Sequence, residues 1–163
     1  MGAWLDTVFG LPTHVLVVHA TVVLLPLATF LAVVLVLRRG LIHRWGLATV
    51  AVTAVGTAAA WLSRGSGEQL ASRVGSPQPH VEYGDALPVH ATFFLALVLA
   101  YWLSARGVPG NRPRPWWVLL LGVAVVVGAV GLVVSTVVTG HSGAEAAWGA
   151  IVENTRLGQF SPP

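Results

Sequence analysis

Five of the six histidines lie at one end of the apolar segments of this chain: His14, His19, His80, His90 and His141. Imidazole nitrogens ligate haem iron, zinc and copper, and they also accept and release protons. Two of these histidines lie in the same tetrapeptide, Val-His-Ala-Thr, at residues 18–21 and 89–92. Ionisable side chains within apolar membrane segments are costly and usually functional. The repeated histidine therefore predicts a binding site.

Composition sets the class of protein that must position these rings. The 163 residues are 55% hydrophobic and 9% charged, with a mean hydropathy of +0.77, which leaves too little polar surface for a soluble globule. Four apolar runs, 13–37, 42–62, 86–105 and 116–139, are long enough to cross about 30 Å of hydrocarbon. We predict an all-α membrane protein with four transmembrane helices in one domain, 1–163, and a tail over 140–163. The absence of cysteine excludes disulfides, thiolate-ligated iron–sulfur clusters and covalently attached haem.

Charge is distributed unevenly between the two ends. Six arginines lie in the two loops 38–44 and 106–114, whereas all six acidic residues and Arg64, Arg73 and Arg156 lie in the other segments. The positive-inside rule makes the two arginine loops cytoplasmic, so both termini and the histidine-rich end are expected to be exoplasmic in a bacterial plasma membrane. Tryptophans near both ends of the segments fit an interfacial belt. The excess of arginine over acidic residues predicts contact with anionic lipid headgroups and not with nucleic acid.

The chain looks internally duplicated. Besides the two tetrapeptides, Gly-Ser-Gly-Glu-Gln at 65–69 aligns with His-Ser-Gly-Ala-Glu at 141–145. We expect an up-down-up-down bundle of two hairpins related as a parallel repeat, about an axis along the membrane normal. The first and third helices would then lie diagonally, with His19 and His90 facing one central cavity at equivalent depth.

A b-type haem with His19 and His90 as axial ligands is the favoured cofactor for such a cavity. The protein would then be a membrane cytochrome that transfers electrons near the exoplasmic side. Small residues on the second and fourth helices would make room for the macrocycle. Arg64 and Arg73 are candidates to bind haem propionates, with anchoring in lipid headgroups as an equal alternative.

The remaining histidines need separate arguments. Five residues turn a helix about 140° beyond one full turn, so His14 and His19 cannot reach one metal from a regular helix. His14 either forms a second metal site with His141, hydrogen-bonds a cofactor carboxylate or lies unbound in the interface. His80 lies in a Pro-Gln-Pro-His loop and is expected to be solvated, and His43 is assigned to the opposite interface.

Two other classes of function are open. In a haem-free metalloprotein, zinc or copper would bind to a larger set: His14, His19, His90 and His141, with Glu82 or Asp85. An open coordination position would allow hydrolysis, with Asp85 as the candidate general base. Alternatively, the chain is a non-catalytic accessory subunit, or part of an oligomer, packed against a respiratory complex. A stand-alone enzyme is less favoured than an electron-transfer or accessory subunit.

The pattern His14-Val-Leu-Val-Val-His19, then a second histidine-bearing helix, then Thr-Gly-His-Ser-Gly at 139–143, resembles the domain-of-unknown-function 2231 family of predicted bacterial membrane proteins. The resemblance covers nearly the whole chain and matches His14, His19 and His141. In the family the first motif reads His-Pro-x-x-x-His-Phe-Pro, whereas Val15 and Ala20-Thr21 stand here. Some members are fused to Rieske domains, which implies a membrane redox partner.

Overall fold

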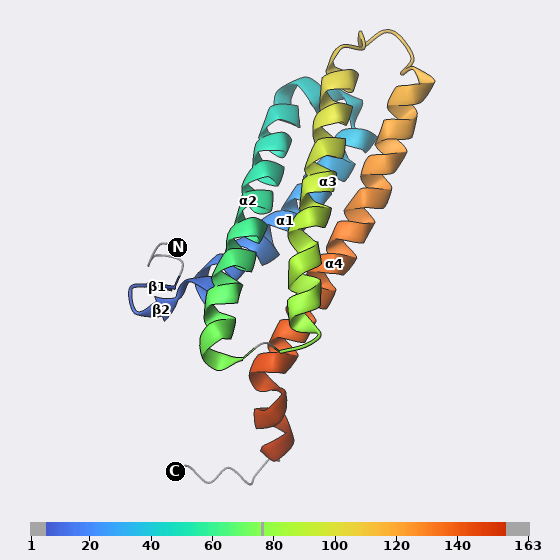
Figure 1. The fold of residues 1–163 in the computed structure, drawn as a ribbon. Coiled ribbons are helices and arrows are strands. Elements are labelled where there is room, and N and C mark those ends of the chain that lie inside the picture. Colours follow the sequence, from blue (N-terminus) through green and yellow to red (C-terminus); the bar gives the residue numbers. More distant parts are fainter. Residues whose placement is uncertain (1–5, 76, 156–163) are drawn as a thin grey trace.

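The structure is a computed structural model that describes residues 6–75 and 77–155, and it is predominantly helical (Figure 1). The four long helices are α1 (Thr13–Leu37), α2 (Ile42–Val74), α3 (His80–Arg106) and α4 (Trp116–Asn154). The 3-10 turn η2 (Arg39–Leu41) joins α1 to α2, and a hairpin of β1 (Thr7–Val8) and β2 (Leu11–Pro12) precedes α1. Each long helix is long and apolar enough to span a membrane, which confirms the predicted four-helix all-α class and fits a multi-pass membrane protein.

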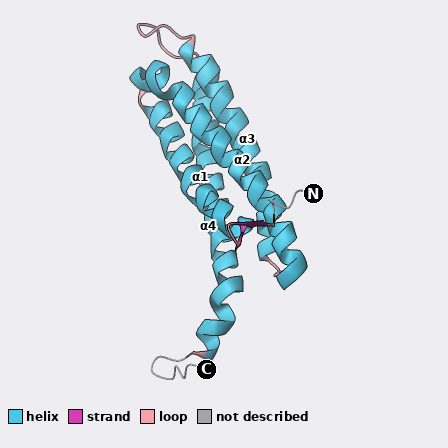
Figure 2. Ribbon diagram, turned by 90° about the vertical axis from the view of Figure 1, so that its left-hand side faces the viewer, coloured by secondary structure: helices cyan, strands magenta, loops and turns pink. Residues whose placement is uncertain are grey.

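The helices form a bundle in which α1 and α3 occupy opposite corners. Both α1 and α3 pack against α2 and α4, and Figure 2 shows the bundle from the side. At one end, which we call the arginine end, the two arginine loops meet. There Arg39 donates a hydrogen bond to the carbonyl of Pro109, and Arg114 donates to the carbonyl of Val36 at 2.8 Å. His14 and His80 lie at the other end, which we call the histidine end.

The core is apolar, and the threonine hydroxyls that α2 buries in it are satisfied locally. Tyr101 and Phe94 are among the largest fully buried side chains. On α2, Thr49, Thr53 and Thr57 each donate to the carbonyl four residues earlier, at 3.0, 2.8 and 2.8 Å. These bonds remove the cost of burying a free hydroxyl where no water competes. Large apolar side chains also cover much of the outside, as expected for a lipid-facing surface.

Three helix boundaries differ from the apolar runs of the sequence. Helix α2 continues to Val74 instead of 62, α3 begins at His80 instead of 86, and α4 continues to Asn154 instead of 139. An apolar run marks only the part of a helix immersed in hydrocarbon, whereas the backbone stays helical beyond it. Part of the predicted 140–163 tail is therefore helix, and residues 156–163 lie outside the described residues.

The small hairpin fixes where α1 begins. Phe9 and Gly10 form its two-residue turn with positive φ values of 52° and 78°, as a turn that matches the twist of antiparallel strands requires. The Thr13 amide then donates to the Asp6 carbonyl at 3.1 Å. The Asp6 side chain pairs with Arg73 near the end of α2. These contacts hold the start of α1, including His14, beside α2.

Candidate metal centre at the histidine end

Two imidazole rings meet at the histidine end. His14 lies in the first turn of α1 and His80 is the first residue of α3, and both are half-buried. Their ring centroids are 6.3 Å apart and the ring planes lie at 73° to one another. Because α1 and α3 occupy opposite corners, this histidine pair bridges the diagonal of the bundle. The structure therefore corrects the expectation that His80 is a solvated loop residue.

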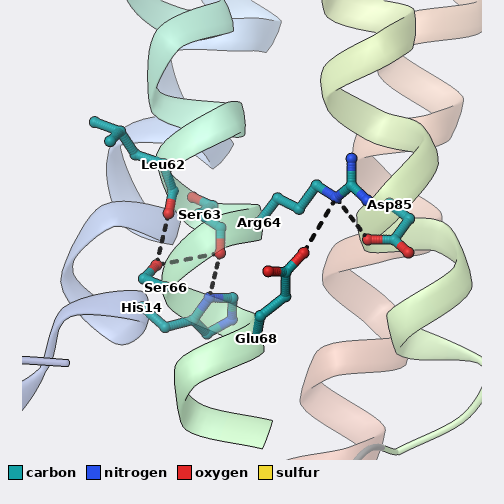
Figure 3. A network of polar contacts seen from close by, with 7 residues as sticks. All are labelled: His14, Leu62, Ser63, Arg64, Ser66, Glu68 and Asp85. Carbon is teal, nitrogen blue, oxygen red and sulfur yellow. Dashed lines mark hydrogen bonds and ion pairs between the residues drawn. The ribbon is translucent and has the colours of Figure 1, made fainter. Parts of the chain in front are cut away.

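The hydrogen bonds of His14 define which nitrogen is free to bind. Its Nδ1 lies 2.8 Å from the backbone carbonyl oxygen of Ser63 on α2 (Figure 3). A carbonyl oxygen only accepts, so Nδ1 carries the hydrogen, and Nε2 of the neutral ring presents a lone pair. The same carbonyl accepts a second bond from the Ser66 hydroxyl at 3.1 Å, and that hydroxyl also contacts the Leu62 carbonyl at 2.8 Å.

The same assignment follows for His80. Its Nδ1 lies 3.2 Å from the hydroxyl oxygen of Ser142 on α4, and this hydroxyl donates to the Thr139 carbonyl at 3.0 Å. When the single hydrogen of the Ser142 hydroxyl goes to Thr139, its oxygen accepts from Nδ1 of His80. The hydrogen-bond network therefore assigns the Nδ1–H tautomer to both rings. Both Nε2 lone pairs are then available to an electrophile.

Two glycines make the space that these rings occupy. A Cβ atom at Gly67 of α2 would lie 3.1 Å from Cε1 of His14, and one at Gly143 of α4 would lie 2.9 Å from Cε1 of His80. A Cβ at Gly65 or Gly140, a few residues away on the same helices, would meet nothing within 4 Å. Gly67 and Gly143 hold the same position in the two aligned segments, 65–69 and 141–145. A histidine ring fills the missing side chain in each case.

The charged groups near the histidine pair are engaged with one another. Nε of Arg64 lies 2.9 Å from Oδ1 of Asp85 and 3.6 Å from Oε1 of Glu68 (Figure 3). Its guanidinium lies 5.7 Å from the Trp61 ring centroid. Arg64 thus links α2 to α3. Both Arg64 and Arg73, the predicted propionate ligands, have carboxylate partners within the chain. Asp85, the predicted general base, accepts from Arg64.

The structure does not bring His19 and His90 together. Both side chains are exposed, on helices at opposite corners, so the packed core separates them. Nδ1 of His19 lies 2.5 Å from the Val15 carbonyl of its own helix, and Nδ1 of His90 lies 3.0 Å from the Ser135 hydroxyl of α4. Each ring thus contacts its own helix or a neighbouring one, and the binding of one haem by both histidines stays a prediction from the sequence.

Depth along the helices separates the two sets of histidines. At 1.5 Å per residue, His19 lies about 27 Å from the arginine end of α1 and His90 about 24 Å from that of α3. By the same measure His14 lies about 35 Å and His80 about 39 Å from that end. A hydrocarbon core of about 30 Å would leave the histidine pair in the aqueous interface.

The two remaining histidines are not grouped with the pair. His141, a predicted ligand, is exposed on α4, and His43, assigned to the opposite interface, lines a cleft of about 320 Å³ at the arginine end. Within residues 6–75 and 77–155, no three His, Cys, Asp or Glu side chains are grouped so as to hold a metal ion. The predicted four-histidine zinc or copper site therefore does not form in one described chain.

Heptad spacing is the sequence signal that could have found the histidine pair. His14 lies seven residues before Thr21, and His80 lies seven residues before Leu87. Both following residues are buried, and the same spacing continues along each helix to other buried residues: Ala28 and Leu35 on α1, Phe94 and Tyr101 on α3. Seven residues are nearly two turns, so each histidine lies above the buried face of its helix.

Comparisons with known protein families, curated proteins and solved structures find no match to this chain. The resemblance to the domain-of-unknown-function 2231 family therefore stays a prediction from the sequence.

Proposed function

We propose that this protein binds a copper(I) ion at the exoplasmic mouth of its membrane bundle, through Nε2 of His14 and Nε2 of His80. The separation of the two rings carries the proposal. The two ring centroids are 6.3 Å apart, which is close enough for one ion to lie between two ring nitrogens at the usual bond length of about 2 Å each.

The hydrogen bonds support the same role. A metal-bound histidine usually donates its second ring N–H to a carbonyl or another acceptor, which fixes the ring and makes it a better ligand. Ser63 and Ser142 supply these acceptors here. Imidazole suits copper as well as zinc, and structural zinc almost always takes four protein ligands. With no third protein ligand grouped at the pair among the described residues, copper suits the site better than zinc.

The chain's own residues suggest binding rather than hydrolysis. Gly67 and Gly143 let the rings approach α2 and α4, and the two acceptors orient them. Asp85 is held by Arg64 and is not free to act as a general base. The arginine distribution supports an exoplasmic site in a bacterial plasma membrane, where the aqueous interface would give a donor or acceptor of the ion direct access.

Copper(I) titration against a competing chelator tests the proposal on purified, detergent-solubilised protein. We expect one equivalent to bind, and His14→Ala and His80→Ala each to weaken binding by at least about 100-fold. His43→Ala, at the arginine end, is the matched control and should bind as the parent does. Stoichiometric binding that survives both substitutions at the histidine pair would contradict the proposal.

We propose electron transfer through haem b, shared with another chain, as the second function. The orientation of His19 favours it, because Nδ1 donates to Val15 and leaves Nε2 on an exposed ring at the expected membrane interface. A second axial ligand would come from a partner, such as a subunit of a respiratory complex. Haem would supply the one-electron chemistry when bound, and His19 would position it.

Absorption spectra separate this second function from the first. A complex isolated in mild detergent should show a reduced-minus-oxidised b-type spectrum that His19→Ala abolishes. A colourless complex that still takes up copper(I) would leave only the first proposal.

A further inference from the structure

One face of α4 carries a continuous exposed stripe with alternating spacings of four and three residues. Its members are Trp116, Leu120, Val123, Val127, Val130, Val134, Val137, His141, Ala144, Trp148 and Ile151, all exposed. A mean spacing of 3.5 residues is the period of the contact seam between two supercoiled helices.

The stripe faces away from the chain's own bundle. The buried residues of α4 form a second row with the same spacing: Val118, Gly122, Val125, Ala129, Leu132 and Thr136. This row is offset by two residues, about 200° around the helix, from the exposed stripe. The exposed stripe therefore lies opposite the face that packs against α1 and α3.

Lipid alone does not account for the whole stripe. Counted from Trp116, about 20 residues of α4 cross the hydrocarbon, so Ala144 to Ile151 lie about 12 to 22 Å beyond it. Figures 1 and 2 show this part of α4 extending past the other helices toward the C-terminus. Trp148 and Ile151 are largely exposed there, and bilayer hydrocarbon would not reach them.

We propose that this stripe is the seam of a parallel homodimer, with α4 of a second copy as its occupant. Nine large apolar side chains of the stripe are each more than half exposed, and a specific interface buries about 800 Å² on each partner, which a row of this length can supply. Both copies insert into the membrane in the same orientation, which makes the two α4 helices parallel.

Twofold symmetry then sets the pairing. Each stripe residue lies opposite its own counterpart, because the symmetry axis runs along the seam. Within the membrane most stripe residues are valines, and the valines of one α4 helix pack against those of the other. His141 faces His141 of the second copy at the histidine end, which gives this exposed histidine a place in the assembly.

Single-cysteine crosslinking in native membranes tests the dimer, since the chain has no cysteine of its own. Val130→Cys lies in the seam, and Phe93→Cys on α3 is the matched control. These parent residues are 61% and 71% exposed, and both lie about 20 Å from the arginine end. With a copper-free thiol oxidant, we expect a disulfide dimer from Val130→Cys and at least tenfold less from Phe93→Cys.

The period of crosslinking adds a second measurement. Val127→Cys and Val134→Cys should crosslink as Val130→Cys does, and Trp148→Cys should extend the pattern beyond the membrane. Equal crosslinking at Phe93, or none along the stripe, would overturn the proposal and leave α4 facing lipid.

Discussion

The two glycine contacts predict a matched series of substitutions at the histidine pair. In Gly143→Ala, the new methyl group would lie 2.9 Å from the His80 ring, which must rotate away from Ser142. Gly140→Ala places the same methyl group three residues earlier on the same helix, in open space. Gly67→Ala and Gly65→Ala form the equivalent couple on α2.

The expected loss of copper(I) affinity follows from the hydrogen bond that the histidine ring loses. A displaced ring loses its hydrogen-bonded orientation, and loss of such support typically costs 10- to 100-fold in metal affinity, about 1.4 to 2.7 kcal/mol. The two controls, Gly140→Ala and Gly65→Ala, should bind copper(I) within about twofold of the parent. Each should gain about 0.5 to 1 kcal/mol of stability, because alanine loses less conformational entropy than glycine when a helix forms.

The assay combines copper(I) competition titration with thermal unfolding in the same detergent. Thermal unfolding shows whether weaker binding comes from a displaced His80 ring or from a destabilised bundle. We expect Gly143→Ala to unfold near the parent temperature despite its weaker binding. The reasoning fails if Gly140→Ala weakens binding as much as Gly143→Ala does, or if Gly143→Ala binds normally.

Three further predictions concern the bundle and its proton dependence. Gly46→Ala should destabilise the protein by about 1 to 3 kcal/mol, because its methyl group would collide with the Trp102 ring; thermal unfolding measures this. Tyr101→Phe should unfold at or above the parent temperature, because it removes a buried hydroxyl without a hydrogen-bond partner among the described residues. Copper(I) affinity should decrease as the pH is lowered, because protons compete with the ion for the Nε2 lone pairs of its ligands; titration at several pH values checks the direction.

The helices themselves were predictable because lipid imposes a simple rule. A segment that crosses hydrocarbon must be apolar over about 20 residues, and it must satisfy its backbone internally, so hydropathy identifies it. Hydropathy does not identify the parts of a helix that lie outside the hydrocarbon. Helix α3 gains its first turn from Pro79, which precedes it, and Glu82, which favours a helix N-terminus, so His80 joins the helix outside the apolar run.

The histidine pair was harder to predict because it depends on which face each helix buries. The repeated tetrapeptide drew attention to His19 and His90, yet repetition carries no information about direction. The heptad row from His80 through Leu87 is visible in the sequence, but several rows run along each helix, and the burial of Leu87 shows which of them faces the core. The pairing of Ser142 with His80 also needs α3 and α4 in contact, which no local pattern specifies.

The diagonal position of the histidine pair has a consequence for biogenesis. His14 belongs to the first hairpin to be synthesised and His80 to the second, and their helices occupy opposite corners. A nascent chain that has inserted only α1 and α2 therefore carries one imidazole of the two. The proposed ion site would be complete only when the second hairpin docks, so a half-made protein would offer the ion one imidazole instead of two.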